Sequence, residues 1–296
     1  MSIAVRRVII LALGFLGGLC AWPVAEAILT AQGRFPSYLV FLVVLGALSG
    51  AIIGAFFGAA EGITSRVRTR IRAGMLLGGA AGCVGGVAGM LVGQAVLWII
   101  GESFLRSSAS FRLVVLPVSR AIGWGALGIF IGAGEGARAA SPRKIGIGVL
   151  GGLAGGLVGG FALEYARVLS PSFTLWRLLG FVILGLSISL LYALVESGMS
   201  FGVLRVLTGP LKGKEYLLNQ GRMRLGRSRR NEIALTGYDD LAEVQARIRI
   251  RRREVVLENL AAAPELLVNE KKVEETRLKL GDVIHLGSAR LFYRHE

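Results

Sequence analysis

Three glutamates, each at the end of a long apolar run, are the residues of this sequence best placed to do chemistry inside a membrane. They are Glu61, Glu135 and Glu196. Ionisable side chains within a bilayer usually serve a function, so three equivalent carboxylates could bind cations or relay protons. In the structural interpretation, which we favour, each carboxylate lies near the water boundary, where a charge costs little. It then pairs with an arginine such as Arg66 or Arg138.

A basic segment in the C-terminal third forms a second candidate site. It contains Arg227, Ser228, Arg229, Arg230 and Asn231. The guanidinium group matches the geometry of phosphate oxygens, so this segment predicts a loop that binds a phosphorylated or acidic partner. The alternative is a solvated basic loop in which Arg227 serves packing.

Residue sets that would indicate catalysis or a metal site are missing from the sequence. There is no glycine-rich phosphate loop of the G-x-x-x-x-G-K-[ST] type. The only histidines, His285 and His295, lie in the C-terminal part, and Cys20 and Cys83 stand alone in apolar stretches. We therefore expect no catalytic residues, no metal, no cofactor and no enzymatic activity.

The mean hydropathy of +0.63 and the 53% of hydrophobic residues predict a membrane protein. A bilayer core about 30 Å thick needs about 20 apolar residues per helix. Six stretches qualify, although the fourth is short unless it starts within residues 113–119, with Pro117 in its first turn. The predicted spans, with the lipid bilayer as partner, are roughly residues 7–29, 38–60, 73–100, 122–134, 145–165 and 179–195.

Basic residues concentrate on one side of the six predicted spans, within residues 66–72, 138–144 and 205–214. Lys and Arg beside a span mark its cytoplasmic side, so both termini are predicted to be cytoplasmic in a multi-pass protein of a bacterial inner membrane. The first span, which ends near Ala25-Glu26-Ala27, also imitates a cleaved signal peptide. We favour a retained helix, because this span takes part in an internal repeat.

The repeat is visible as small residues, mostly glycine, that recur every fourth position within the spans. Such stripes allow helix backbones to approach closely in lipid. The odd-numbered spans also carry a polar residue near their far ends, Glu26, Gln94 or Glu164. We infer three copies of a two-helix unit, and the stripes could also join copies of the chain into a homo-oligomer. The packing glycines are Gly50, Gly54, Gly58, Gly128, Gly132, Gly152 and Gly156.

From about residue 201 the pattern changes to the period-two alternation that is typical of β-strands. Short apolar strands separated by glycine and proline turns over about ninety residues predict a β-sandwich. The sequence therefore predicts two domains, a transmembrane helical bundle over residues 1–200 and an all-β domain over residues 201–296.

Three segments of the β domain, in this order, resemble the forkhead-associated (FHA) family. They are Leu225-Gly226-Arg227-Ser228 with Asn231-Glu232-Ile233-Ala234-Leu235, then Val268-Asn269-Glu270-Lys271-Lys272-Val273, then Leu280-Gly281-Asp282-Val283-Ile284-His285-Leu286-Gly287. The last is similar to the family's L-x-x-G-D-x-I-x-L-G ending. The resemblance covers roughly residues 206–294. It implies an eleven-strand sandwich that binds phosphothreonine peptides through loops at one end, with Arg227 as the phosphate-contacting arginine.

The binding loops depart from the FHA pattern. The family's phosphate-binding serine falls on Ala242, its structural histidine on Gln245 or Ala246, and its loop asparagine on Pro264. Ala242 has no hydroxyl, and Pro264 has neither a side-chain donor nor a backbone N–H. We therefore expect a protein-binding module that does not depend on phosphothreonine.

A stripe of arginines lies on one face of the strand predicted near residues 244–250 and just beyond it. It could lie against anionic lipid head groups, or it could be an exposed strand face that is kept charged to prevent edge-to-edge aggregation. We favour the second interpretation. The strand lacks the aromatic residues that stack on bases, so we expect no nucleic-acid partner. The stripe is Arg247, Arg249, Arg251 and Arg253.

Two functions fit these features. The first is a membrane-anchored signalling scaffold whose cytosolic FHA-like domain recruits a protein partner. The second is a transporter or channel in which three repeats surround a path lined by Glu61, Glu135 and Glu196, with the β domain as regulator. We favour the scaffold, because the spans lack helices broken by polar residues at the middle of the membrane.

Overall fold

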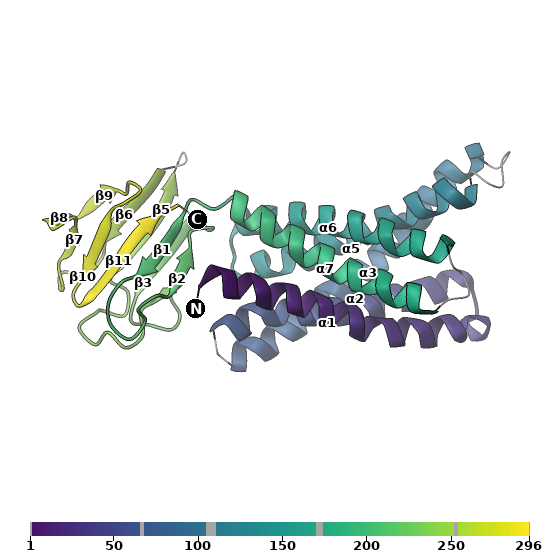
Figure 1. Ribbon diagram of the computed structural model, residues 1–296, viewed down its shortest axis with the longest axis horizontal. Helices are drawn as coiled ribbons and strands as arrows, with labels where there is room; N and C mark the ends of the chain where they lie inside the picture. The colour runs from purple at the N-terminus through teal and green to yellow at the C-terminus, as the bar shows by residue number, and fades with distance from the viewer. Residues whose placement is uncertain (1, 66–67, 105–110, 170–173, 252–253, 296) are drawn as a thin grey trace. The chain divides into compact units, whose positions relative to one another are not determined.

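The computed structural model divides the chain into two compact units, Arg7–Glu196 and Met1–Arg6 with Ser197–Glu296. It describes all residues except 1, 66–67, 105–110, 170–173, 252–253 and 296 (Figure 1). At a few other positions, Glu135 and Arg251 among them, only the backbone is described. Each unit is considered by itself below.

Six helices long and apolar enough to cross a membrane make up the first unit, as the sequence predicts. A helix satisfies its own backbone hydrogen bonds, which lipid cannot do. The fourth span is longer than residues 122–134, because α5 begins at Leu116 and Pro117 fits its first turn. The helices are α1 (Ile3–Thr30), α2 (Tyr38–Ser65), α3 (Arg68–Phe104), α5 (Leu116–Arg138), α6 (Pro142–Leu169) and α7 (Thr174–Gly198). Two short turns, η1 (Gln32–Arg34) and η2 (Phe111–Val115), precede α2 and α5.

The glycine stripes lie where helices touch backbone to backbone. A methyl group added at Gly54 of α2 would lie 2.2 Å from the carbonyl oxygen of Gly78 in α3. The same test at Gly128 of α5 gives 2.0 Å to the carbonyl oxygen of Gly152 in α6. No side chain fits at either crossing, so glycine is required there. Gly50, Gly58, Gly132 and Gly156 make equivalent contacts, with Gly82, Gly74, Gly148 and Trp124.

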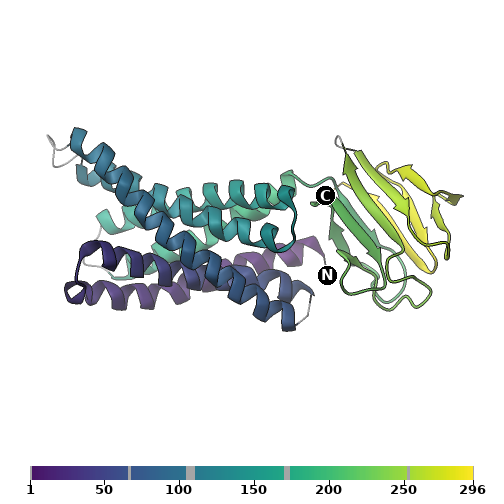
Figure 2. The ribbon, with the colours of Figure 1, turned by 180° about the vertical axis from the view of Figure 1, so that it is seen from behind.

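A third stripe contact closes the helices into a ring. Gly14 of α1 packs on Gly185 of α7, where a methyl group added at Gly185 would lie 2.1 Å from the carbonyl oxygen of Gly14. These two helices lie side by side in both views (Figures 1 and 2). The stripes therefore join the second helix of each predicted two-helix unit to the first helix of the next. Within the units, contacts at Gly17, Gly89 and Gly155 hold α1 to α2, α3 to α5 and α6 to α7.

Aromatic and aliphatic side chains of α2, α5 and α7 meet inside this ring. Phe57 of α2 stacks edge-on against Tyr192 of α7 with ring centroids 5.0 Å apart, and Trp124 of α5 meets Phe181 of α7 at 6.0 Å. Leu127 is 1% exposed. The described residues at the centre thus form a packed core.

The second unit is a sandwich of eleven strands in two sheets, the strand number that the FHA resemblance implies. The six-stranded sheet has the order β2-β1-β11-β10-β7-β8, and the five-stranded sheet the order β4-β3-β5-β6-β9. Leu204, Leu225, Ile248 and Leu291, all fully buried, belong to the core between them. The strands are β1 (Val203–Val206), β2 (Glu215–Leu217), β3 (Arg222–Gly226), β4 (Ile233–Ala234), β5 (Ala246–Arg251), β6 (Glu254–Asn259), β7 (Leu266–Val268), β8 (Lys271–Lys272), β9 (Glu275–Arg277), β10 (Val283–Leu286) and β11 (Ala289–Arg294).

The edge-strand interpretation of the arginine stripe is wrong. Strand β5, which carries Arg247 and Arg249, is the middle strand of its sheet and is hydrogen-bonded to β3 on one side and β6 on the other. A strand paired on both sides cannot recruit another strand. The stripe places Arg247 opposite Arg224 and Arg249 opposite Arg222, and Glu258 forms ion pairs with both β5 arginines. Arg251 and Arg253 lie outside the described side chains.

We predict that Gly54→Ala lowers the stability of the helical unit by about 1–3 kcal/mol, because the added methyl group must push α2 and α3 apart. Gly146 of α6 is the matched control, since a methyl group there would meet no atom within 4 Å. Gly146→Ala should leave stability unchanged or raise it slightly. Thermal unfolding of both variants in detergent, followed by circular dichroism, makes the comparison. Equal effects of the two substitutions would contradict the close packing.

Candidate functional site

The loop between β3 and β4 carries the basic candidate residues and runs beside the loop before β5. The N–H of Arg227 donates to the carbonyl oxygen of Ala242 at 3.0 Å, and that of Ser228 to the oxygen of Glu243 at 3.2 Å. The approach is possible because Gly226 has no side chain. A methyl group there would lie 2.4 Å from the Glu243 oxygen.

Asn231 supports this loop from inside. Its side chain is 3% exposed, and its Nδ2 donates to the carbonyl oxygen of Glu243 at 2.6 Å. Among the five predicted binding residues, Asn231 therefore positions the loop and does not offer its amide to a partner. Arg227, Arg229 and Arg230 are exposed, and Ser228 is half-buried with its Oγ accepting a bond from the N–H of Arg230.

Gln245 ties together the loops at this end of the sandwich. It is fully buried, its Oε1 accepts the N–H of Ala242 at 3.1 Å, and its Nε2 donates to the carbonyl oxygen of Pro264 at 2.8 Å. Ala246 is instead the first residue of β5 and pairs with Leu225. Gln245, and not Ala246, is therefore the residue that bridges the loops.

Asp240 links the same loop region to the turn between β10 and β11. Its carboxylate accepts the N–H of Ser288 at 2.5 Å and the Ser288 hydroxyl at 2.8 Å. These bonds hold the pKa of the Asp240 carboxyl below its ordinary value, the backbone N–H being the larger cause. A methyl group at Gly287 would lie 2.1 Å from this carboxylate, so glycine is needed in the turn.

The three predicted intramembrane carboxylates do not share one environment that the structure describes. Glu61 forms an ion pair with Arg138 of α5, one of the two arginines that the structural interpretation named. Arg66, the other, lies outside the described residues. Glu196 is 3% exposed and interacts with another residue. The side chain of Glu135 is outside the described part of the chain.

A buried polar network lies at the opposite ends of the helices. Glu164 of α6 is 3% exposed. Its Oε2 accepts a bond from Nη1 of Arg120 at 3.2 Å, and its Oε1 accepts the indole N–H of Trp124 at 3.1 Å. Arg120 also donates to the hydroxyl of Tyr38 at 3.1 Å. The sequence pattern singled out Glu164 but not its partners, because they come from α2 and α5, far away along the chain.

A second ion pair of the same kind joins α1 to α7. The guanidinium of Arg177 donates to Oε1 of Glu26 at 2.6 Å, and both side chains are about a quarter exposed. Burial of the Glu26 carboxylate alone among these helices would cost free energy, and the cationic partner Arg177 offsets that cost. In the part of the chain that the structure describes, no three His, Cys, Asp or Glu side chains come together as metal ligands.

Residues 205–296 match the protein family described as the cytoplasmic domain of an inner membrane component of the T3SS. This match covers the β domain alone. No curated protein matches the chain.

Several solved structures are similar to part of the chain. An FHA domain from a structural and functional analysis of phosphothreonine-dependent FHA domain interactions is 27% identical and covers 33% of this chain and 97% of its own, with a TM-score of 0.30. The FhaA FHA domain, crystallised with the intracellular domain of Rv3910, is 27% identical over 31% of this chain and 98% of its own, with a TM-score of 0.29. The FHA domain of the Chlamydia trachomatis protein CT664 is 22% identical and covers 32% of this chain and 96% of its own, with a TM-score of 0.30.

We predict that Gln245→Ala destabilises the β domain by roughly 2–4 kcal/mol, because it removes a fully buried side chain and leaves the N–H of Ala242 and the carbonyl of Pro264 without their bonds. Glu243→Ala, which removes an exposed side chain from the same loop, should change stability by no more than about 0.5 kcal/mol. Urea unfolding of the two variants in detergent measures the difference. Similar urea midpoints for Gln245→Ala and Glu243→Ala would show that Gln245 does not hold the loops.

We also predict that Asp240 contributes acid sensitivity to the β domain. Its pKa is lower in the folded than in the unfolded chain, where it is about 3.9. Its contribution is therefore complete above about pH 4 and is lost as the pH falls through the lower, folded value. Asp240→Asn should be less stable than wild type at pH 6, with the difference shrinking at pH 3. A difference in unfolding midpoint that does not change with pH would refute this assignment.

Proposed function

We propose that this multi-span membrane protein, whose cytoplasmic domain is FHA-like, is a scaffold that recruits a cytosolic protein partner through the loop carrying Arg227, Arg229 and Arg230. The recruitment is not enzymatic and does not require phosphothreonine. The family match on residues 205–296 supports the general role, because that family's description places it in a membrane-bound assembly. Assembly of this chain with such a system belongs to the same proposal.

The observation that carries the proposal is a binding loop whose shape is maintained while its phosphate donors are missing. Gln245 and Asn231, both buried, hold the backbone of the loops in place. Ala242 and Pro264 nevertheless offer no donor for a phosphate group. A loop that is kept rigid without this chemistry is suited to a partner that presents an acidic or polar surface to its exposed arginines.

Glu243 also affects how well the loop distinguishes phosphothreonine from acidic side chains. Its side chain is exposed, and its carbonyl oxygen accepts bonds from both the N–H of Ser228 and the side chain of Asn231. A carboxylate on this loop opposes a dianionic phosphate more strongly than a singly charged carboxylate on a partner. Glu243 therefore reduces the advantage that phosphothreonine would have over an acidic side chain at the basic loop.

We predict that the full-length protein in lipid nanodiscs binds phosphothreonine peptides no better than the same peptides without phosphate. Ala242→Ser restores one charge-assisted donor beside Arg227 and should raise phosphopeptide affinity by about ten- to a hundredfold, since such a bond is worth roughly 1.5–3 kcal/mol. Fluorescence polarisation with matched peptide pairs measures both. A clear phosphate preference of the wild-type protein would refute phosphate-independent recognition.

The partner-binding loop itself can be tested in native membranes. A photo-crosslinking residue at position 230 should give a discrete adduct with one protein, and Arg227→Ala should weaken that adduct. Position 290 is the matched control, because Arg290 is an exposed arginine on β11 of the other sheet. The same adduct from both positions, or none from position 230, would count against recruitment through this loop.

A further inference from the structure

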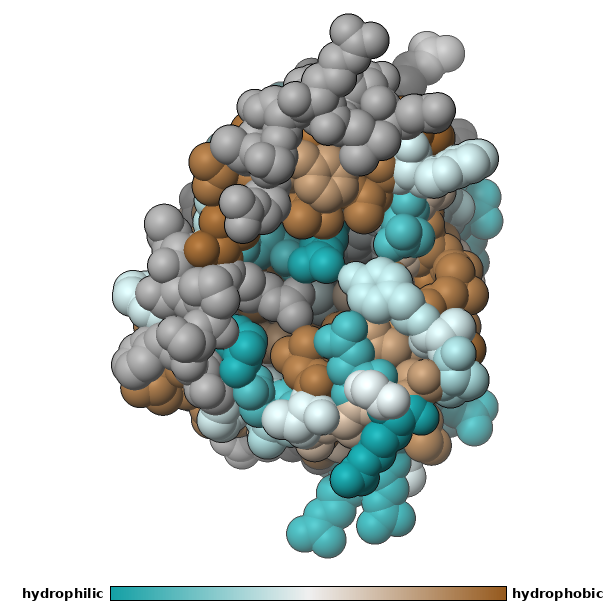
Figure 3. Space-filling model, turned by 90° about the vertical axis from the view of Figure 1, so that its right-hand side faces the viewer, coloured by the Kyte–Doolittle hydropathy of each residue, from teal (hydrophilic) through white to brown (hydrophobic). Residues whose placement is uncertain are grey.

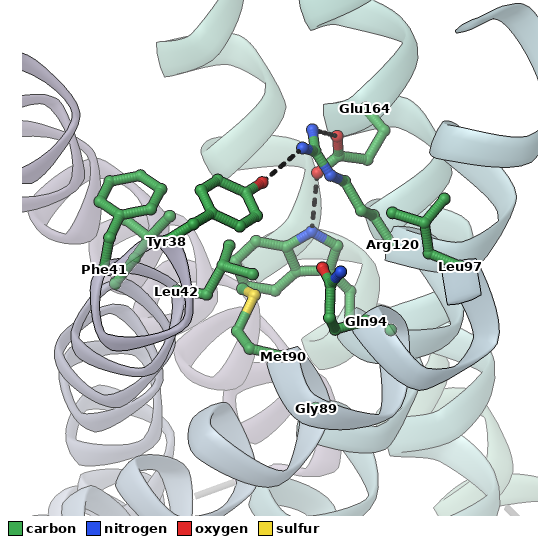
Figure 4. A pocket seen from close by; sticks show the side chains of 12 residues that line it. Tyr38, Phe41, Leu42, Gly89, Met90, Gln94, Leu97, Arg120 and Glu164 are labelled. Carbon is green, nitrogen blue, oxygen red and sulfur yellow. Dashed lines mark hydrogen bonds and ion pairs between the residues drawn. The ribbon is translucent and has the colours of Figure 1, made fainter. Parts of the chain in front are cut away.

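A cavity of about 40 Å³ opens beside the Arg120–Glu164 ion pair, among α2, α3, α5 and α6. This volume accommodates roughly three water molecules, or one small oxyanion group. One part of its wall is apolar, with Phe41, Leu42, Leu45, Met90 and Leu97. The other part is polar and holds Tyr38, Gln94, Arg120 and Glu164 (Figure 4).

The cavity lies where the ring departs from its own symmetry. At the contact of Gly128 with Gly152, Arg120 lies eight residues before Gly128 and Glu164 lies twelve residues after Gly152. At the contact of Gly185 with Gly14, Arg177 lies eight residues before Gly185 and Glu26 lies twelve residues after Gly14. Applied to the third stripe contact, Gly50 with Gly82, this spacing gives Leu42 and Gln94, which cannot form an ion pair. The α2–α3 contact therefore lacks the ion pair that the other two contacts have.

Hydrogen-bond donors outnumber acceptors in this cavity. Both oxygens of Glu164 already accept bonds, from Trp124 and Arg120. The hydroxyl of Tyr38 accepts a bond from Arg120, so its own hydrogen remains to be donated. Arg120 has five N–H groups, of which two are accounted for by these bonds. The amide of Gln94 bonds to no other residue that the structure describes. A donor-rich cavity is complementary to a group with several acceptor oxygens.

The surroundings indicate where such a group comes from. The cavity lies inside the unit of membrane-crossing helices, near the start of α2. With an even number of spans and a cytoplasmic C-terminal domain, this end is the non-cytoplasmic one. Seen from that end, hydrophilic residues gather between apolar ones (Figure 3). An apolar wall next to donors matches an acyl chain next to a phosphodiester.

We propose that this cavity binds the phosphodiester of a phospholipid from the non-cytoplasmic leaflet. Arg120, Tyr38 and Gln94 donate to the phosphate oxygens, and the side chains from Phe41 to Leu45 and Met90 pack against the start of an acyl chain. Glu164 keeps Arg120 in place and offsets part of its positive charge, so the remaining donors suit a singly charged phosphodiester better than a dianion. The lipid fills the one stripe contact that has no ion pair.

The test uses the full-length protein, purified in detergent and freed of lipid. Addition of phosphatidylglycerol should raise the thermal unfolding midpoint in a saturable way. Diacylglycerol has the same chains without the phosphate, and inorganic phosphate has the anion without the chains; neither should produce the shift. A shift with inorganic phosphate alone would overturn the lipid assignment, and an equal shift with diacylglycerol would overturn the phosphate contact.

Two variants decide whether the shift arises in this cavity. Tyr38→Phe combined with Gln94→Leu removes two donors and no charge, so the helical unit should still fold, and the apparent affinity for phosphatidylglycerol should fall by about a hundredfold or more. Arg120→Lys should also weaken the response, whereas Arg177→Lys, the matched change in the equivalent ion pair, should leave it intact. An unchanged response in the double variant, or equal losses in both lysine variants, would overturn the proposal.

Discussion

Close approach of helix backbones at glycine is the constraint on which the helical unit depends. At Gly54 and Gly128, a single added carbon would lie within 2.2 Å of an opposed carbonyl oxygen. Apolar helices gain little from packing in lipid through hydrophobicity, so contact area and small residues decide which helices associate. Because the same contact occurs between α2 and α3, α5 and α6, and α7 and α1, six helices close into a ring with a packed centre.

The pairing of charged residues in this unit depends on the ring of helices. Helices held so closely bring Glu164 within reach of Arg120, and Glu26 within reach of Arg177. Glu164 and Glu26 are thereby each matched with a cation from a neighbouring helix, which makes their positions within a membrane tolerable. The ion pairs therefore consolidate a structure that the glycines define. The missing third pair leaves the cavity next to Gln94 and Met90.

The FHA-like domain separates the support of a binding loop from its chemistry. Gln245 supports the loops by bonds to Ala242 and Pro264, and Asn231 supports them by a bond to Glu243. The groups that would contact phosphate are reduced to Arg227 and its basic neighbours. A scaffold can keep such a loop for a different partner, because rigidity serves any specific interface.

The sequence alone predicted six spans followed by a β-sandwich, because long apolar runs and period-two alternation are local signals. The number of eleven strands was implied by the resemblance to the FHA family. It also predicted that glycine stripes mark helix contacts and that the carboxylates pair with arginines such as Arg138, and the structure adds that the carboxylate paired with Arg138 is Glu61. Only the tertiary structure decided which stripes face each other, that β5 is a central strand, and that Gln245 rather than Ala246 bridges the loops. The network of Tyr38, Arg120 and Glu164 was also beyond the sequence. Its members are far apart along the chain, and a pattern of local spacing carries no information about which helices become neighbours.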